Sequence, residues 1–233
     1  MNISIHQPTY WPWLGLLNKV ALSDIFIILD NVEASKGSFQ YRNLFLCNNK
    51  AKYVTLPVNL HNRPLLSDLK FKDSNWKKKQ LSLIADYYRR SDYFHDIFPE
   101  VIDVYEDYQS NSSCGLIINS MLKCFELFDI NVIVKKASDL NLTKKKGMLV
   151  LEICQKLKVS TYISGQGAIA YMNKDLIEDF SKAGIQLKWQ TFTHPTYYQG
   201  NKSPNFIEGL SSLDLLFHNG IENSRSILYK TIK

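Results

Sequence analysis

The chain has 233 residues, of which 45% are hydrophobic and 21% are charged. These values exclude a disordered or fibrous chain, and a chain of this length buries enough surface to fold without disulfides or zinc. Lysine and arginine outnumber aspartate and glutamate by 28 to 22, which gives a net charge of +6 and favours anionic partners. Much of the excess lies in two lysine runs, 77–79 and 144–146, and such short runs are usually solvated.

The cysteines and the apolar runs narrow the class of protein further. The four cysteines form no CxxC pair and no Cys/His cluster, which argues against a zinc site and fits reduced thiols. The N-terminus shows no signal-peptide pattern, and no apolar run approaches the roughly 18 residues that a membrane helix needs. We therefore expect a cytoplasmic protein with no membrane span and no bound metal.

The predicted elements alternate between strand and helix along the chain. Residues 3–5 predict a strand, residues 14–22 a helix and residues 25–29 a buried strand, which together form a βαβ unit. Pro99 is expected to start a second helix within residues 93–108. Further strands are predicted at 52–58, 131–134, 161–164 and 185–189, and further helices at 77–90, 114–128, 148–157, 174–183 and 213–217.

This order predicts an α/β fold with a mostly parallel, Rossmann-like sheet flanked by helices. We expect a single domain over residues 1–233. The helices between about residues 60 and 128 are predicted to form an insertion or cap.

Four clusters follow predicted strands or lie near the sheet, and ligands bind such sheets at the carboxyl ends of their strands. The first cluster is a stiff loop rich in proline and aromatic residues after the first strand. Here His6 is a candidate general base, and Gln7, Tyr10 and Trp13 are candidate substrate-binding residues. The structural alternative is a rigid aromatic plug around a buried histidine.

The second cluster follows the buried strand 25–29. Asp30 could bind a ribose hydroxyl, a metal or a substrate amine, or could instead form an Asx turn. Arg42 suits a phosphate or carboxylate because its planar guanidinium binds in a bidentate manner, and Asn43 is a neutral hydrogen-bond donor beside it.

The third cluster is Ser164-Gly165-Gln166-Gly167, again between a strand and a helix. Its two glycines, Gly165 and Gly167, allow close backbone approach and suit a phosphate loop. The segment matches neither the GxGxxG nor the Walker pattern, and it is not the GxSxG of an acyl-enzyme nucleophile.

The fourth cluster lies near the C-terminus and contains Tyr197, Gln199 and Asp214. These residues could form a pocket wall for a sugar or a base. The alternative is a C-terminal strap packed over the edge of the sheet.

The chain resembles the WbqC-like family of bacterial O-antigen and surface-glycan gene clusters. The resemblance spans essentially the whole chain. It rests on the opening His6-Gln7-Pro8-x-Tyr10-x-Pro12-Trp13-x-Gly15 with Lys19 and Asp24, on Leu29-Asp30, Lys36, Arg42-Asn43 and Pro57, on Tyr162-Ile163-Ser164-Gly165 with Gly167 and Tyr171, on Pro195-x-Tyr197-x-Gln199, and on the closing stretch from Leu210 to Phe217. The resemblance implies transfer of an amino acid, glycine in particular, onto an O-antigen sugar.

The opening segment also resembles, more loosely, that of the HIGH-type nucleotidyltransferases and small adenylating ligases. That likeness implies that the loop after the first strand and the segment at Ser164 close over ATP phosphates. The second histidine of the HIGH pattern is absent here, so the likeness is an analogy.

Our leading hypothesis is a cytoplasmic transferase that attaches an amino acid or acyl group to an amino sugar in surface-polysaccharide biosynthesis. His6 would accept the amine proton, Asp30 would position the amine, and Arg42 with the glycine loop would bind phosphate. The partners would be a nucleotide-linked amino sugar and an activated acyl or aminoacyl donor, with ATP and Mg²⁺ as candidate cofactors. A nucleic acid would take part only if an aminoacyl-tRNA were the donor. The alternative is a non-catalytic sugar-nucleotide-binding or scaffold protein of a glycan assembly complex.

Overall fold

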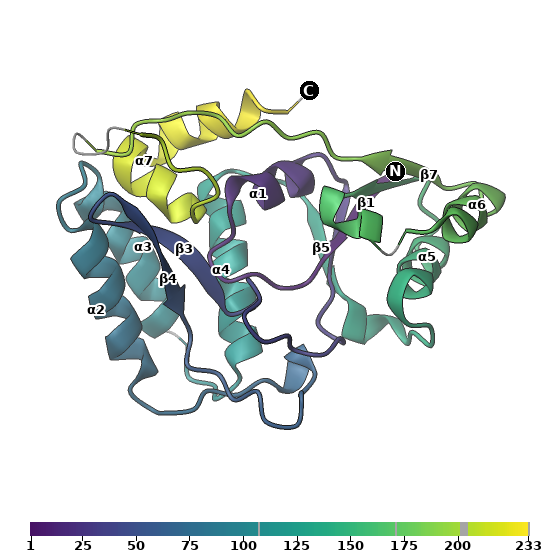
Figure 1. Ribbon diagram of the computed structural model, residues 1–233, viewed down its shortest axis with the longest axis horizontal. Helices are drawn as coiled ribbons and strands as arrows, with labels where there is room; N and C mark the ends of the chain where they lie inside the picture. Colours follow the sequence, from purple (N-terminus) through teal and green to yellow (C-terminus); the bar gives the residue numbers. More distant parts are fainter. Residues whose placement is uncertain (107, 171, 201–204, 233) are drawn as a thin grey trace.

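The computed structural model describes residues 1–106, 108–170, 172–200 and 205–232 (Figure 1). Tyr171, one of the residues that carry the family resemblance, lies outside the described residues. Within the described part of the chain, no helix has both the length and the apolar character needed to cross a membrane.

Five parallel strands form the central sheet, in the order β5-β2-β1-β6-β7. The strands are β1 (Asn2–His6), β2 (Ile25–Ile28), β5 (Ile133–Lys136), β6 (Thr161–Ser164) and β7 (Gln186–Trp189). All four neighbouring pairs run parallel. The predicted α/β class and parallel sheet are therefore confirmed.

The two faces of the sheet pack into two separate cores, because successive side chains of a strand point to opposite faces. On one face, α5 (Lys146–Lys156) and α6 (Lys174–Lys182) cover isoleucines of β1 and β2, namely Ile3, Ile5, Ile25 and Ile27. On the other face, Phe26 and Ile28 join a larger core with α1 (Leu14–Ala21) and α4 (Ser113–Leu127).

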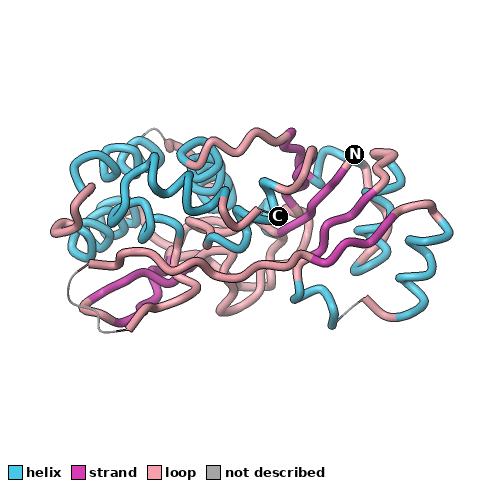
Figure 2. Tube along the Cα trace, turned by 90° about the horizontal axis from the view of Figure 1, so that it is seen from above, coloured by secondary structure: helices cyan, strands magenta, loops and turns pink. Residues whose placement is uncertain are grey.

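The larger core extends beyond the sheet into a helical region (left in Figure 1). That region holds α2 (Trp76–Tyr88), α3 (Phe94–Glu106), α7 (Ser212–Tyr229) and the antiparallel hairpin of β3 (Arg42–Cys47) and β4 (Lys50–Thr55). Seen from above, the hairpin and these helices lie at one end of the molecule and the parallel sheet at the other (Figure 2). Helices α2, α3 and α4 share one core with Phe26 and Ile28 of the sheet, and Phe125 of α4 packs edge to face against Phe26, with ring centroids 5.6 Å apart.

Three elements differ from the prediction. Pro99 does not start a helix but lies inside α3, because Ile97, Val101 and Tyr105 bury one continuous face of that helix. Strand β3 was not expected, since the only strand predicted in that region was 52–58. The last helix runs 18 residues instead of the five predicted, and it continues through a kink at Gly220, where φ is 72°.

The strand order reverses between β1 and β6. From β1 the chain crosses to β2, the neighbour on one side, whereas β6 and β7 continue the sheet on the other side. In open α/β sheets, the crevice outside the carboxyl ends of the strands at such a point is the usual ligand site.

Candidate functional site

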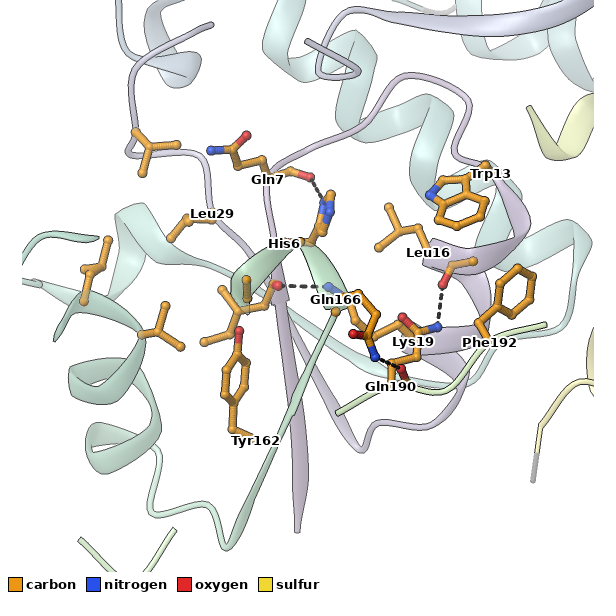
Figure 3. Close-up of a pocket in the computed structure, with 18 of the residues that line it drawn as sticks. His6, Gln7, Trp13, Leu16, Lys19, Leu29, Tyr162, Gln166, Gln190 and Phe192 are labelled. Carbon is orange, nitrogen blue, oxygen red and sulfur yellow. Dashed lines mark hydrogen bonds between the residues drawn. The ribbon is translucent and has the colours of Figure 1, made fainter. Parts of the chain in front are cut away.

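A cavity of about 700 Å³ lies at this reversal point (Figure 3). Its lining includes His6 and Gln7 after β1, Lys19 from α1, and Gly165 and Gly167 after β6. The first and third predicted clusters, which lie about 160 residues apart in the sequence, therefore meet in one cavity.

The loop after β1 is held rigidly. The Asn43 side chain donates hydrogen bonds to the carbonyl oxygens of Tyr10 (3.1 Å) and Trp11 (2.7 Å). These contacts fix a turn in which Trp11 has a φ of 41°, and its indole is fully buried. The backbone that carries His6 into the cavity is thus well positioned.

His6 presents a neutral imidazole to the cavity. Its Nδ1 lies 2.8 Å from the carbonyl oxygen of Gln7, which can only accept, so the hydrogen is on Nδ1 and the Nε2 lone pair is free to accept a proton. Burial, with a smaller effect of the nearby Lys19 charge, lowers the pKa of His6 to about 3. The ring is therefore neutral at physiological pH.

Lys19 brings an unpaired amine to the floor of the same cavity. The residue is only 4% exposed, and its Nζ donates to the carbonyl oxygen of Ile5 at 3.2 Å. Among the described residues, no carboxylate forms an ion pair with it. Burial lowers the pKa of Lys19 to about 7. A buried lysine without an acidic partner is costly to the fold and is typical of a functional site.

The segment after β6 leaves its backbone open to the cavity. A Cβ atom at Gly165 would lie 4.0 Å from both Lys19 Nζ and the side-chain oxygen of Gln190, and a Cβ at Gly167 would have no neighbour within 4 Å. Gln190 follows β7 and is held by its amide nitrogen, which donates to Gly15 O (2.7 Å) and Asn18 Oδ1 (2.6 Å). Backbone and amide groups thus surround the amine of Lys19.

The aromatic rings of Trp13 and Phe192 form one wall of the cavity. Trp13 is 37% exposed and packs edge to face against Phe192, with ring centroids 5.5 Å apart. A Cβ at Gly15 would lie 2.3 Å from the indole of Trp13, so only glycine lets the ring lie flat over the first turn of α1. In Figure 3, Trp13 and Phe192 lie on the side of the cavity that includes Leu16.

Two lysines, Lys19 and Lys146, and no carboxylate lie in the described lining of the cavity. Within the described chain, no group of three or more histidine, cysteine, aspartate or glutamate side chains could hold a metal ion. The arrangement suits an anionic ligand that carries its own hydrogen-bond acceptors.

The model of the WbqC-like protein family matches residues 7–226, nearly the whole chain. The chain belongs to the WbqC-like protein family. It is also 24% identical over 225 residues to the uncharacterized protein Rv1507c of Mycobacterium tuberculosis, with 95% of each chain covered. No solved structure matches it significantly.

Three predicted residues of this WbqC-like protein support the cavity without lining it. Tyr10 is fully buried, and its hydroxyl contacts Gln80 and Tyr105. Asn43 holds the loop after β1, as described above. Ser164, at the end of β6, is also fully buried and is not in the lining. These side chains shape the site and do not face the ligand space.

The structure does not bring Asp30 or Arg42 into the cavity. Both carboxylate oxygens of Asp30 accept from Ser138, one from its backbone N–H (3.0 Å) and one from its hydroxyl (2.8 Å), and Asp30 is not in the cavity lining. The Arg42 guanidinium stacks on the Tyr53 ring, 3.9 Å from its centroid. Asp30 therefore does not position an amine in this cavity, and Arg42 does not bind a phosphate there.

The fourth predicted cluster is a separate, closed network. Tyr88 donates to one oxygen of Asp214 (3.1 Å), and Tyr197 and Gln199 donate to the other (3.0 and 3.2 Å). Asp214 has no exposed surface. This network joins α2, α7 and the segment after β7, and none of its residues lines the cavity.

Sequence reasoning missed Lys19, Gln166 and Gln190 as site residues in this WbqC-like chain. The sequence signal for Lys19 is its place in a short, mostly apolar helix, LGLLNKVA. Its orientation toward β1 depends on the tertiary fold. Gln166 lay inside the predicted glycine loop, whereas Gln190 carried no local pattern.

Proposed function

We propose that this WbqC-like protein is a transferase that forms an amide on an amino sugar. A glycine-like amino acid or another acyl group would come from an activated donor, in surface-polysaccharide (O-antigen) biosynthesis in the cytoplasm. The observation that carries the proposal is the neutral His6 ring, whose Nε2 is free in a cavity at the carboxyl ends of β1 and β6.

His6 acts as the general base. As the sugar amine attacks the activated carbonyl carbon, a C–N bond forms, the amine loses a proton to Nε2 of His6, and the donor's leaving group departs with its electron pair. A pKa of about 3 keeps the ring neutral but makes it a weak base. Since the Lys19 charge contributes to that low value, an anionic ligand beside Lys19 would raise the basicity of His6 when it binds.

The remaining walls suit a nucleotide-linked amino sugar. Trp13 offers an exposed aromatic face for a sugar or a base, and the side chains of Gln7, Gln166 and Gln190 offer amide groups. ATP is a candidate activator of the donor. The described lining offers no carboxylate to hold Mg²⁺, so a magnesium ion would be bound there only through the phosphates and water.

The test is a product assay by mass spectrometry. The purified protein would be incubated with nucleotide-linked amino sugars and glycine plus ATP and Mg²⁺, with an acyl thioester, or with an aminoacyl-tRNA. We expect an amide product with one of these donors, and at least about a hundredfold slower formation after His6→Ala substitution. Binding of the sugar nucleotide without product from any donor would favour a non-catalytic binding or scaffold protein instead.

A further inference from the structure

The amine of Lys19 needs a partner that the chain itself does not supply. It is nine-tenths buried, it faces the cavity, and its one hydrogen bond goes to the carbonyl oxygen of Ile5. The titratable side chains that line the cavity with it are His6 at the end of β1, Tyr162 in β6 and Lys146 at the start of α5. None is an aspartate or a glutamate, so no carboxylate of the described lining balances the charge of Lys19.

We propose that the floor of this cavity binds a phosphate group of the substrate, with Lys19 as its charged partner. The assignment rests on the proposed function only for the identity of the whole ligand, a nucleotide-linked sugar. The phosphate site itself follows from the geometry of the cavity.

A bound phosphate group places several oxygen atoms around the amine of Lys19, and the cavity has space and polar groups for them. At Gly165 and Gly167 no side chain covers the backbone, so a bulky oxyanion can approach it closely. Gln166 donates through its side-chain amide to Gln190 O at 3.1 Å, which places a second amide group at the same edge. Lys146, which is exposed in the lining, adds a second positive charge. Two ammonium groups without a carboxylate favour a diphosphate over a single carboxylate.

Calorimetric titration of the full chain with inorganic pyrophosphate tests this site without turnover. We expect binding to the native protein and at least about a tenfold loss of affinity in Lys19→Met, since a hydrogen bond to a charged group contributes about 1.5 to 3 kcal/mol. Lys78→Met, at an exposed lysine of α2 outside the cavity lining, is the matched control and should change affinity by less than about threefold. Lys19→Gln is a second variant in which an amide replaces the charge, and thermal unfolding checks that each variant is folded.

Three results would overturn the proposal. They are no pyrophosphate binding to the native protein, equal binding to native and Lys19→Met, and glycine binding that depends on Lys19 as strongly as pyrophosphate binding does. The last result would assign Lys19 to a carboxylate. Failure here leaves a His6-dependent amide product intact, whereas failure of the product assay leaves the phosphate site intact, so the two proposals fail separately.

Discussion

The molecule contains two clusters of buried polar side chains that differ in how many hydrogen-bond partners the protein supplies. Asp214 accepts three hydrogen bonds from Tyr88, Tyr197 and Gln199 in a region closed to solvent. Lys19 and His6 have one close backbone partner each and face a cavity. A satisfied cluster stabilises one arrangement of the chain, whereas unsatisfied groups beside an open space are ready to bind a ligand.

The difference shows why residue type alone misleads in a site search. Asp214 is an acid with a perturbed pKa, raised to about 6 chiefly by burial and lowered in part by the hydrogen bonds it accepts. Such a value is typical of catalytic acids as well as of structural networks. The number and direction of the hydrogen bonds, together with the absence of Asp214 from the cavity lining, place it in the structural class.

The largest expected effect is on transfer by the His6→Ala variant. Without the Nε2 acceptor, the rate should fall at least about a hundredfold, as for the loss of a general base, while the melting temperature stays near the native value. The measurement is the initial rate of amide formation. His61→Ala, at an exposed histidine, is the control and should transfer normally. A folded His6→Ala variant with native activity would remove His6 from the mechanism.

Asp214→Ala should have the opposite effect to His6→Ala: a large loss of stability with little effect on ligand binding. It leaves two tyrosine hydroxyls and an amide without their acceptor in the core, which should cost about 3 kcal/mol or more in unfolding free energy. Urea denaturation measures this loss, and Tyr197→Phe should cost only about 1 kcal/mol because one hydrogen bond is removed. Pyrophosphate affinity of the folded fraction should not change. A stable Asp214→Ala variant would break the distinction between the two clusters.

Lys19→Met should increase stability while it weakens pyrophosphate binding at least about tenfold. Because burial lowers the pKa of Lys19 from 10.5 to about 7, the fold disfavours its charged form, and replacing it with a similar apolar side chain should raise the unfolding free energy by about 1 kcal/mol. Lys146→Met, at an exposed position, should stay within about 0.5 kcal/mol of native. A marked loss of stability in Lys19→Met would indicate that Lys19 is structural.

The smallest net effect is on the pH dependence of stability, where the two clusters oppose each other. The pKa of His6 is lowered from 6.5 to about 3, so its contribution to stability is lost as pH falls through that range. The pKa of Asp214 is raised from 3.8 to about 6, so its contribution is lost as pH rises through that range.

The two variants separate these opposing contributions in urea titrations between pH 4 and 7. Asp214→Asn should steepen the loss of stability on acidification, and His6→Ala should make the protein more stable as pH falls. Identical pH profiles in native protein and both variants would contradict the pKa values assigned to the two groups.

Much of the fold could be predicted because local pattern and tertiary structure agree. The buried run 25–29, the helix with Asn173 at its N-cap and the strand that leads into Gly165 all read directly from the chain. Pro99 misled because its local preference was outweighed by burial of α3. Strand β3 was missed because its conformation depends on antiparallel pairing with β4, which no local pattern shows.

The site could be predicted only where its residues follow strands. His6, Gln7, Gly165 and Gly167 were identified by their position at the carboxyl ends of β1 and β6. Asp30 shares that kind of position, yet its partner Ser138 lies 108 residues away, so its occupied state is a property of the tertiary fold. The burial of Lys19 is likewise set by packing against β1, which no local pattern shows.

The most direct test of the central claim is an amide NMR map of the native protein titrated with pyrophosphate. We predict shifts concentrated at residues 6–7, 15–19 and 165–168, with the backbone around Tyr88, Tyr197 and Asp214 unchanged. Shifts centred on the Asp214 network, or no saturable shifts at all, would contradict the assignment of the β1–β6 cavity as the functional site.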